Sequence, residues 1–332
     1  MKEQKHISIL VPSGDAVLSS IIGTFKAFNA ANEYMMHIGK TQAPFFKVQL
    51  VGMHAEETSL YQGAFIIRPH ITIDQLTHTD LVIIPALSGN IPAEVDHNKD
   101  FVPWIIEQYK KGSEVASLCV GAFLLASTGL IDGKKCTTHW IACDNFRQMY
   151  PNVSLVTEKI VTDENGIYTS GGAFSYLNLV LYLIEKYSGR DVAIYCSKLL
   201  EVDIDRQSQL PFAIFGGQQT HQDDVVQKAQ QYIEQNYAEK ITIDQLADRF
   251  AISRRNLERR FKKASGNSPV EYIQRVKIEA AKKSFESSRE NINEVMYAVG
   301  YSDSKAFRAT FRKITGVSPL EYKQRYNREM VN

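Results

Sequence analysis

Hydrophobic positions in the first two thirds of the chain alternate between short continuous runs and helical spacing. Continuous apolar runs, which are typical of buried strands, begin at Ile7, Phe46, Leu81 and Glu114. Helical spacing predicts helices at residues 20–32, 101–111, 174–187 and 191–201. D-E-N-G at residues 163–166 predicts a hairpin turn. Buried strands separated by helices predict an α/β fold, a three-layer sandwich with a parallel sheet covered on both faces.

Beyond residue 222, every periodic segment predicts a helix, and the pattern repeats. G-N-S-P-V-E-Y at residues 266–272 returns as G-V-S-P-L-E-Y at residues 316–322. Such a repeat indicates two copies of one supersecondary unit. We therefore predict a sensor domain at 1–205, a linker at 206–222, where a proline, a glycine pair and a polar run occur, and an all-α domain at 223–332.

Each copy predicts a helix-turn-helix motif, two short helices joined by a tight turn. In the first copy, Leu257 and Phe261 form the buried stripe of the second helix. Steps of 100° per residue then place four side chains on or at the edge of the open face: Arg255, Glu258, Arg259 and Lys262. A recognition helix presents this face to the major groove, where arginine pairs with guanine. We expect three neighbours to lie nearer the phosphates: Arg254, Arg260 and Lys263.

The second copy gives the same construction, with Phe307 and Phe311 buried. Its open face carries Lys305, Arg308 and Arg312. Between the copies, residues 270–287 predict one helix of 18 residues, about 27 Å long. A rigid spacer of this size suits two recognition helices in successive major-groove segments, about 34 Å apart.

The charge distribution supports a nucleic-acid partner. Residues 223–332 hold 21 Lys and Arg against 15 Asp and Glu, a net +6, whereas the preceding residues hold 17 against 22, a net −5. A basic helix by itself is often only a solvated face, but two copies with one architecture favour DNA binding, and we expect promoter DNA as the partner.

These residues resemble the AraC/XylS family of transcription regulators over residues 224–326. The resemblance rests on S-R-R-N-L-E-R-R-F-K, G-Y-S-D, F-R-K-I-T-G and S-P-L-E-Y. It implies two helix-turn-helix motifs joined by a long helix. Two positions depart from the family pattern: Ala309 replaces a usual arginine, and Met296 replaces a usual small residue. The second motif is therefore expected to contribute less sequence readout than the first.

E-V-A-S-L-C-V-G-A-F-L-L-A at residues 114–126 predicts strand, tight turn and helix, with Cys119 at the turn. A nucleophile elbow has this layout, and the helix N-terminus would lower the thiol pKa. Two further motifs, H-W at His139 and S-G-G at Ser170, are expected at the same sheet edge, where α/β proteins place ligands. A histidine such as His139 also has a structural interpretation, as the hydrogen-bonded start of a helix.

This region resembles the ThiJ/PfpI superfamily, also described as class I glutamine amidotransferase-like, over residues 7–187. The motifs are S-L-C-V-G-A-F-L-L-A, G-L-I-D-G-K, T-T-H-W and I-Y-T-S-G-G. Such a domain before an AraC-type domain is the architecture of GlxA-like regulators. The resemblance implies a homodimer through the N-terminal domain and an effector, often a small nitrogen-containing metabolite. Ser20 stands where related regulators usually carry Asp, which leaves Asp15 as the acid of the first loop.

Three roles for Cys119 remain open: the wall of an effector pocket, packing, or a reactive thiol in a hydrolase, an amidase or a redox sensor. Since no convincing triad accompanies the elbow, we predict no catalytic residue and no enzyme. The pocket candidates are Ser20, Cys119, Val120, His139, Trp140, Ser170 and Gly171. Cysteine spacing predicts free thiols, and we expect no metal and no cofactor. With no signal peptide or membrane span in the sequence, we expect a cytoplasmic protein.

Overall fold

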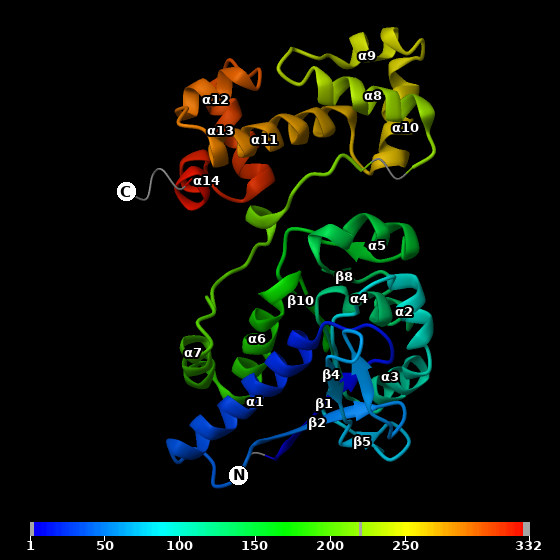
Figure 1. Cartoon of the computed structure of the whole chain (residues 1–332), viewed down its shortest axis with the longest axis vertical. Helices are drawn as coiled ribbons and strands as arrows, with labels where there is room; N and C mark the ends of the chain where they lie inside the picture. The colour runs from blue at the N-terminus through cyan, green and yellow to red at the C-terminus, as the bar shows by residue number, and fades with distance from the viewer. Residues whose placement is uncertain (1–2, 219–220, 328–332) are drawn as a thin grey trace. The chain divides into compact units, whose positions relative to one another are not determined.

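The computed structural model describes residues 3–218 and 221–327. The chain divides into two compact units, unit 1 at Met1–Gln209 and unit 2 at Leu210–Asn332 (Figure 1). Among the described residues, every strand lies in unit 1, and unit 2 is helical.

Unit 1 is built on a seven-stranded sheet with the order β10-β11-β7-β6-β1-β2-β5. These strands are β1 (Lys5–Val11), β2 (Phe46–Gly52), β5 (Ile71–Thr72), β6 (Leu81–Ile84), β7 (Glu114–Ser117), β10 (Val161–Glu164) and β11 (Ile167–Ser170). Neighbouring strands are parallel except for the β10–β11 pair. In the turn of that pair, Asn165 and Gly166 have φ of 56° and 79°. Two successive positive φ values suit a tight hairpin, so the turn prediction is confirmed.

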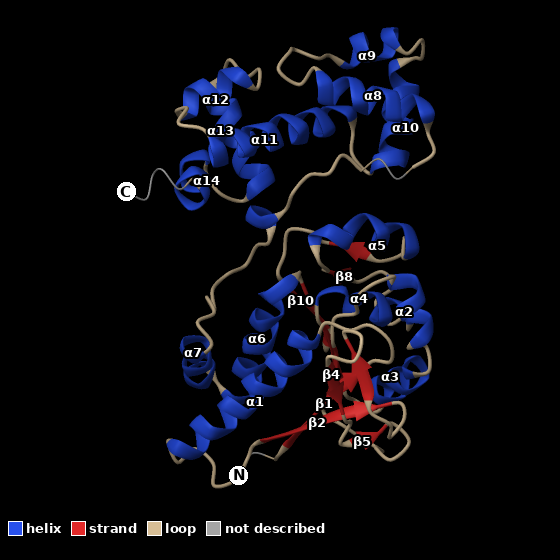
Figure 2. Ribbon diagram, in the orientation of Figure 1, coloured by secondary structure: helices blue, strands red, loops and turns tan. Residues whose placement is uncertain are grey.

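Helices cover both faces of the sheet (Figure 2). One face carries α1 (Leu18–His37), α6 (Tyr176–Ser188) and α7 (Arg190–Leu199), and the other carries α2 (Ile91–His97), α3 (Phe101–Lys110), α4 (Ala122–Ser127) and α5 (Cys143–Met149). In β6, Leu81 and Ile83 enter the first core, while Val82 and Ile84 enter the second. A strand buried on both faces explains the continuous apolar run. The predicted three-layer α/β fold is confirmed.

Four short strands outside the seven-stranded sheet escape the hydrophobic pattern. They are β3 (Thr58–Leu60) and β4 (Phe65–Ile67), which form a hairpin, and β8 (Lys135–Cys136) and β9 (Ser154–Leu155). Two or three residues are too few to show a period of two. The first helix extends beyond the expected residues 20–32, because buried positions continue through Met35.

Unit 2 contains η4 (Leu210–Phe212), α8 (Asp224–Gln235), α9 (Ile243–Arg249), α10 (Arg254–Ser265), α11 (Pro269–Ser287), α12 (Ile292–Ala298), α13 (Ser304–Thr315) and α14 (Pro319–Tyr326). One core surrounds Leu257 and Phe261 of α10, and a second surrounds Phe307 and Phe311 of α13. Helix α11 contributes to both cores. Its 19 residues correspond to about 28 Å, close to the predicted spacer.

The described part of the expected linker is hydrogen-bonded rather than free. In unit 1, Gln207 O accepts from Ile160 N at 3.1 Å, and Gln209 N donates to Glu158 O at 3.1 Å. In unit 2, Lys282 Nζ donates to Ala213 O at 2.7 Å. Residues 207–213 thus form part of the two units at their junction in the sequence.

Candidate functional sites

The first recognition helix, α10, presents a row of basic side chains. Leu257 and Phe261 are fully buried, and Ser253 caps the helix by accepting from Asn256 N. The exposed basic residues are Arg254, Arg255, Arg259, Lys262 and Lys263, and Glu258 is half-buried beside them. The helical register that buries the two apolar residues therefore leaves these basic side chains open to an anionic partner.

Two arginines of this helix have local partners. Arg254 contacts Glu258 Oε1 through Nε at 3.1 Å and Asp244 Oδ2 through Nη1 at 3.4 Å. Arg259 Nη2 donates to Asn256 Oδ1 at 3.0 Å. Because these contacts are exposed, they stabilise the side chains only weakly and leave them able to exchange partners.

Arg260, which we expect near the phosphates, is paired within the protein. Its Nε and Nη2 donate to the two carboxylate oxygens of Asp223 at 2.9 and 2.6 Å. Asp223 also caps α8 by accepting from Val226 N at 3.2 Å. The hydrogen bonds from Arg260 hold the pKa of Asp223 below its usual range, although partial burial opposes them. Arg260 therefore fastens α10 to α8 through a partner 37 residues away in the sequence, and its contact with a phosphate stays a prediction.

The second recognition helix, α13, repeats the first with fewer basic residues. Phe307 and Phe311 are buried, and Asp303 caps the helix. Lys305, Arg308 and Arg312 are exposed, as is Lys313. Arg308 Nε donates to Ser304 Oγ at 3.2 Å. The predicted open face is thus basic in both copies.

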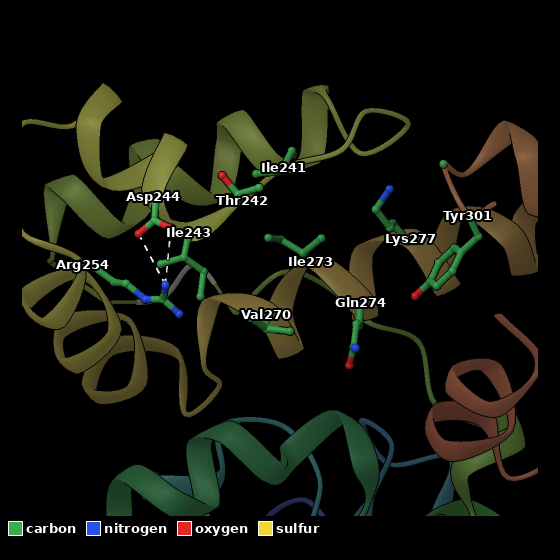
Figure 3. Close-up of a pocket in the computed structure, with 11 residues that line it drawn as sticks. Ile241, Thr242, Ile243, Asp244, Arg254, Val270, Ile273, Gln274, Lys277 and Tyr301 are labelled. Carbon is green, nitrogen blue, oxygen red and sulfur yellow. Dashed lines mark hydrogen bonds and ion pairs between the residues drawn. The ribbon is translucent and has the colours of Figure 1, made fainter. Parts of the chain in front are cut away.

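A pocket of about 390 Å³ lies along α11 between the two helix-turn-helix copies (Figure 3). Its wall includes the paired Asp244 and Arg254 at one end and Tyr301 at the other. Lys277 of α11 also lines the pocket, and burial lowers the pKa of its ammonium group.

Cys119 occupies a tight turn between β7 and α4. Its φ of 55° lies in the left-handed region, and an added Cβ on Gly121 would collide with Pro85 O. The predicted elbow geometry is therefore present. The thiol, however, is 6% exposed, and burial raises its pKa despite hydrogen bonds from the backbone of Ala173 and Val120. The expected lowering by the helix N-terminus is wrong, because loss of solvation outweighs these bonds.

The groups around this turn bond to one another. Cys119 N donates to Ser170 Oγ at 3.1 Å, and Thr138 Oγ1 donates to Cys119 O at 2.9 Å. Within residues 3–218 and 221–327, no imidazole or carboxylate hydrogen-bonds the thiol. Ser20 is fully buried: its Oγ donates to Val17 O at 2.7 Å and accepts from Ala86 N at 3.1 Å. These hydroxyls tie the sheet edge together rather than activate a nucleophile.

His139 starts a short helix, η2 (Trp140–Ala142), as its structural interpretation expects. Its Nδ1 accepts from Ile141 N at 3.1 Å, and burial lowers the pKa of the imidazole. An added Cβ on Gly172 would collide with the His139 ring, so the ring lies against this glycine. Of the remaining pocket candidates, Val120 and Trp140 are half-buried, and Gly171 is buried.

Gln209 joins this edge without any signal in the sequence. It is 1% exposed, and its Nε2 donates to Thr138 O at 3.0 Å and Thr157 O at 2.9 Å. Gly172 N donates to its Oε1 at 3.3 Å. Gln209 therefore bonds to the residue before His139 and to the glycine beneath its ring. In the sequence, Gln209 lies in the polar, proline-containing segment that we predicted to be a linker, and nothing there indicated these bonds.

An open apolar pocket of about 470 Å³ was also not predicted. It is lined by Leu18, Ser19, Ile22, Gly23, Tyr61, Phe65 and Tyr176, from α1, the β3–β4 hairpin and α6. None of the seven predicted pocket residues lines it.

Other expectations concern cysteines, metals and membranes. All four cysteines are free, as predicted, and all four are buried. Burial raises the pKa of Cys136 and Cys143 to about 12 and that of Cys196 to about 11. The described residues contain no group of three or more His, Cys, Asp and Glu suited to a metal ion. Among them, no helix combines the length and apolar character needed to cross a membrane.

Comparison with known proteins assigns both units. Residues 24–186 match the DJ-1/PfpI family, and residues 246–325 match the helix-turn-helix domain. The HTH-type transcriptional regulator GbdR of Pseudomonas aeruginosa is 26% identical, over 78% of this chain and 70% of its own length. GlxA of Rhizobium meliloti, also an HTH-type transcriptional regulator, is 24% identical over 64% of this chain and 66% of its own.

A solved structure has a similar fold. The crystal structure of a ThiJ/PfpI family protein from Pseudomonas syringae matches with a TM-score of 0.50 and 16% identity, over 75% of this chain and 90% of that one. Together with the family matches and the curated relatives, the exposed recognition helices identify this chain as a DNA-binding transcriptional regulator, in which a DJ-1/PfpI-type domain precedes an AraC-type helix-turn-helix domain.

Proposed function

We propose that this protein is a one-component regulator in which a small molecule at the Cys119 edge changes how α10 and α13 bind promoter DNA. Such a protein acts in the cytoplasm, where it meets the chromosome. A ligand has this effect only if it binds one arrangement of the protein more tightly than another.

The position of Gln209 is the observation that carries the proposal. Its side chain is inserted among residues of the candidate edge, and the next residue, Leu210, begins unit 2. A ligand that moves the His139 ring or Gly172 would disturb the bonds of Gln209. The covalent chain would carry that disturbance directly into the DNA-binding unit.

The state of the thiol argues against catalysis. A nucleophilic cysteine needs a lowered pKa or an adjacent base, and Cys119 has a raised pKa. The same neutral state slows oxidation, which proceeds through the thiolate. We therefore propose no enzymatic activity and no redox sensing for Cys119.

We further propose that unit 1 forms a homodimer. Three exposed apolar side chains that line one open pocket on α1 and the β3–β4 hairpin support this: Ile22, Tyr61 and Phe65 are 48%, 50% and 53% exposed. Contiguous exposed apolar residues mark interaction surfaces. Phe65→Glu should convert the dimer to a monomer in analytical ultracentrifugation, and an unchanged mass would place the interface elsewhere.

DNA binding is tested with the upstream intergenic DNA of the protein's own gene against a scrambled sequence, across a salt series. Specific binding should weaken as salt rises, with log affinity falling against log salt by about 0.9 for each phosphate contact. If fragments from across the genome also showed no preference over scrambled DNA, the proposal would fail.

Sensing is tested by adding a panel of amino acids and small amines to the full chain. A hit should shift the thermal unfolding of unit 1 and change operator affinity. In Gln209→Met, which keeps side-chain length but loses the amide, the thermal shift should persist while the change in affinity disappears. Gln207→Met is the matched control, because Gln207 is exposed two residues earlier. Equal responses in both variants would refute transmission through Gln209.

A further inference from the structure

Lys277 lies where α11 passes from one helix-turn-helix core to the other. The preceding residue, Val276, packs in the first core, and the following residue, Ile278, packs in the second. Lys277 itself is 7% exposed. A buried ammonium group is costly unless hydrogen bonds replace its water, so its acceptors show what it holds together.

Those acceptors come from both copies. Lys277 Nζ donates to Glu239 O at 3.1 Å, in the loop between α8 and α9, and to Val299 O at 2.9 Å, at the end of α12. The ring of Tyr301 lies 5.8 Å from the same nitrogen. One ammonium group thus joins main-chain carbonyls of the first and second copies across the helix that connects them.

Gly300 brings the two copies into direct contact at the same point. Its φ is 74°, and an added Cβ would collide with Ala238 O and lie 2.6 Å from Lys277 Nζ. The turn before α13 therefore packs against the loop before α9, at a distance that only glycine permits. Tyr237, which precedes Ala238, packs against both cores.

We propose that Lys277 is a positioning residue for DNA recognition: with Gly300, it fixes the orientation of α10 relative to α13 and so sets the half-site spacing that the protein accepts. A continuous helix fixes the distance between two motifs but leaves them free to twist and tilt as it bends. One base pair of spacing changes the position of the second half-site by about 3.4 Å and its direction by about 35°. A locked junction makes such a change costly, whereas a loose junction tolerates it.

This inference rests on DNA binding by the two copies, and the test separates the two claims. Full-length wild-type protein first selects its operator from a pool of random DNA. Its affinity is then measured for that operator, for versions with one base pair inserted or deleted between the half-sites, and for each half-site alone. Failure of the wild-type protein to select any DNA would overturn the proposed function itself.

The wild-type protein should lose at least about fivefold in affinity when the spacing changes by one base pair, because base contacts of one half-site are then lost. Lys277→Met should reduce that loss to less than about threefold and weaken binding to the original operator, while half-site affinities stay unchanged. Lys277→Arg should restore the spacing dependence, since a guanidinium group also reaches two carbonyls. A purely structural role would instead weaken half-sites and operator alike.

Lys282→Met is the matched control. Lys282 is another buried lysine of α11, but it bonds to Ala213 O and Glu279 Oε2 and does not join the two copies. It should keep the wild-type spacing dependence. If Lys277→Met does not fold, Gly300→Ala provides the same test, because its Cβ forces the two loops apart. Wild-type spacing dependence in a folded Lys277→Met or Gly300→Ala protein would overturn the proposal.

Discussion

The two helix-turn-helix copies share one frame, displaced by 50 residues, but they present different side chains to solvent. Each recognition helix begins after a capping side chain, at Ser253 or Asp303, and ends at a left-handed glycine, Gly266 or Gly316. Each is followed by a capping box that starts the next helix, Ser268 with Glu271 and Ser318 with Glu321. Local hydrogen bonds therefore specify the same frame twice.

The exposed positions diverge within that frame. Arg259 corresponds to Ala309, Glu258 to Arg308, and Arg260 to Thr310. The first copy has more basic side chains, but Arg260 is bound to Asp223. The number of basic side chains in the first copy is therefore larger than the number that is free to contact DNA. The residues that set where each helix begins and ends are therefore different from the residues presented to DNA. Each set can be changed without the other.

The largest effect is expected from Arg259→Ala, which gives the first copy the residue found in the second. Loss of a bidentate contact with a base should cost about 1–3 kcal/mol, or about 5- to 150-fold in operator affinity. Competition binding with operators varied at each base pair should show relaxed preference at one position. Lys263→Ala serves as control and should weaken operator and scrambled DNA alike. An equal loss on both DNAs for Arg259→Ala would reassign this residue to the phosphates.

Arg260→Ala tests whether the first copy depends on Arg260 for stability in a way that the second copy does not depend on Thr310. We expect it to lower the free energy of unfolding of unit 2 by about 1 kcal/mol at pH 7, because the ion pair is partly exposed and solvent screens it. Thr310→Ala, at the matching position of the second copy, should change it by less than about 0.5 kcal/mol. Calorimetry of the full chain measures both.

The pH dependence of that stabilisation follows from Asp223. Its pKa is lowered in the folded protein from the ordinary 3.8, so the pair stabilises unit 2 above pH 3.8 and loses this effect as pH falls through the lowered value. Wild type and Arg260→Ala should therefore converge in stability at acidic pH. A difference that persisted after Asp223 is fully protonated would mean that Arg260 acts through packing.

How far the sequence predicts each feature depends on the range of the interactions behind it. The exposure of Arg255 or Lys305 follows from helical periodicity within a few residues, so the open faces are predictable. The ion pair of Arg260 was not predictable, because its partner Asp223 is 37 residues away. The bonds of Gln209 to Thr138 span 71 residues, and no local pattern contains them.

The sheet edge shows the same limit. Strand, tight turn and helix around Cys119 are local, and the elbow is present as predicted. The pKa of its thiol depends on how completely the surrounding segments bury it, so its direction could not be derived from the turn alone. Ser20 was expected to line a pocket, yet its bond to Ala86 N, 66 residues away, places it inside the protein.

The smallest effect is expected from Ala309→Arg, which gives the second copy the residue found in the first. Ala309 is exposed, so the longer side chain meets no steric barrier. If the added guanidinium group reaches a phosphate, the slope of log affinity against log salt should steepen by about 0.9 and affinity should rise a few-fold at low salt. Fluorescence anisotropy across a salt series measures both quantities, with Ala309→Gln as the uncharged control. An unchanged slope would show that the exposed face of α13 lies farther from DNA than that of α10. In that case the two copies would differ in their position on DNA as well as in the residues they present.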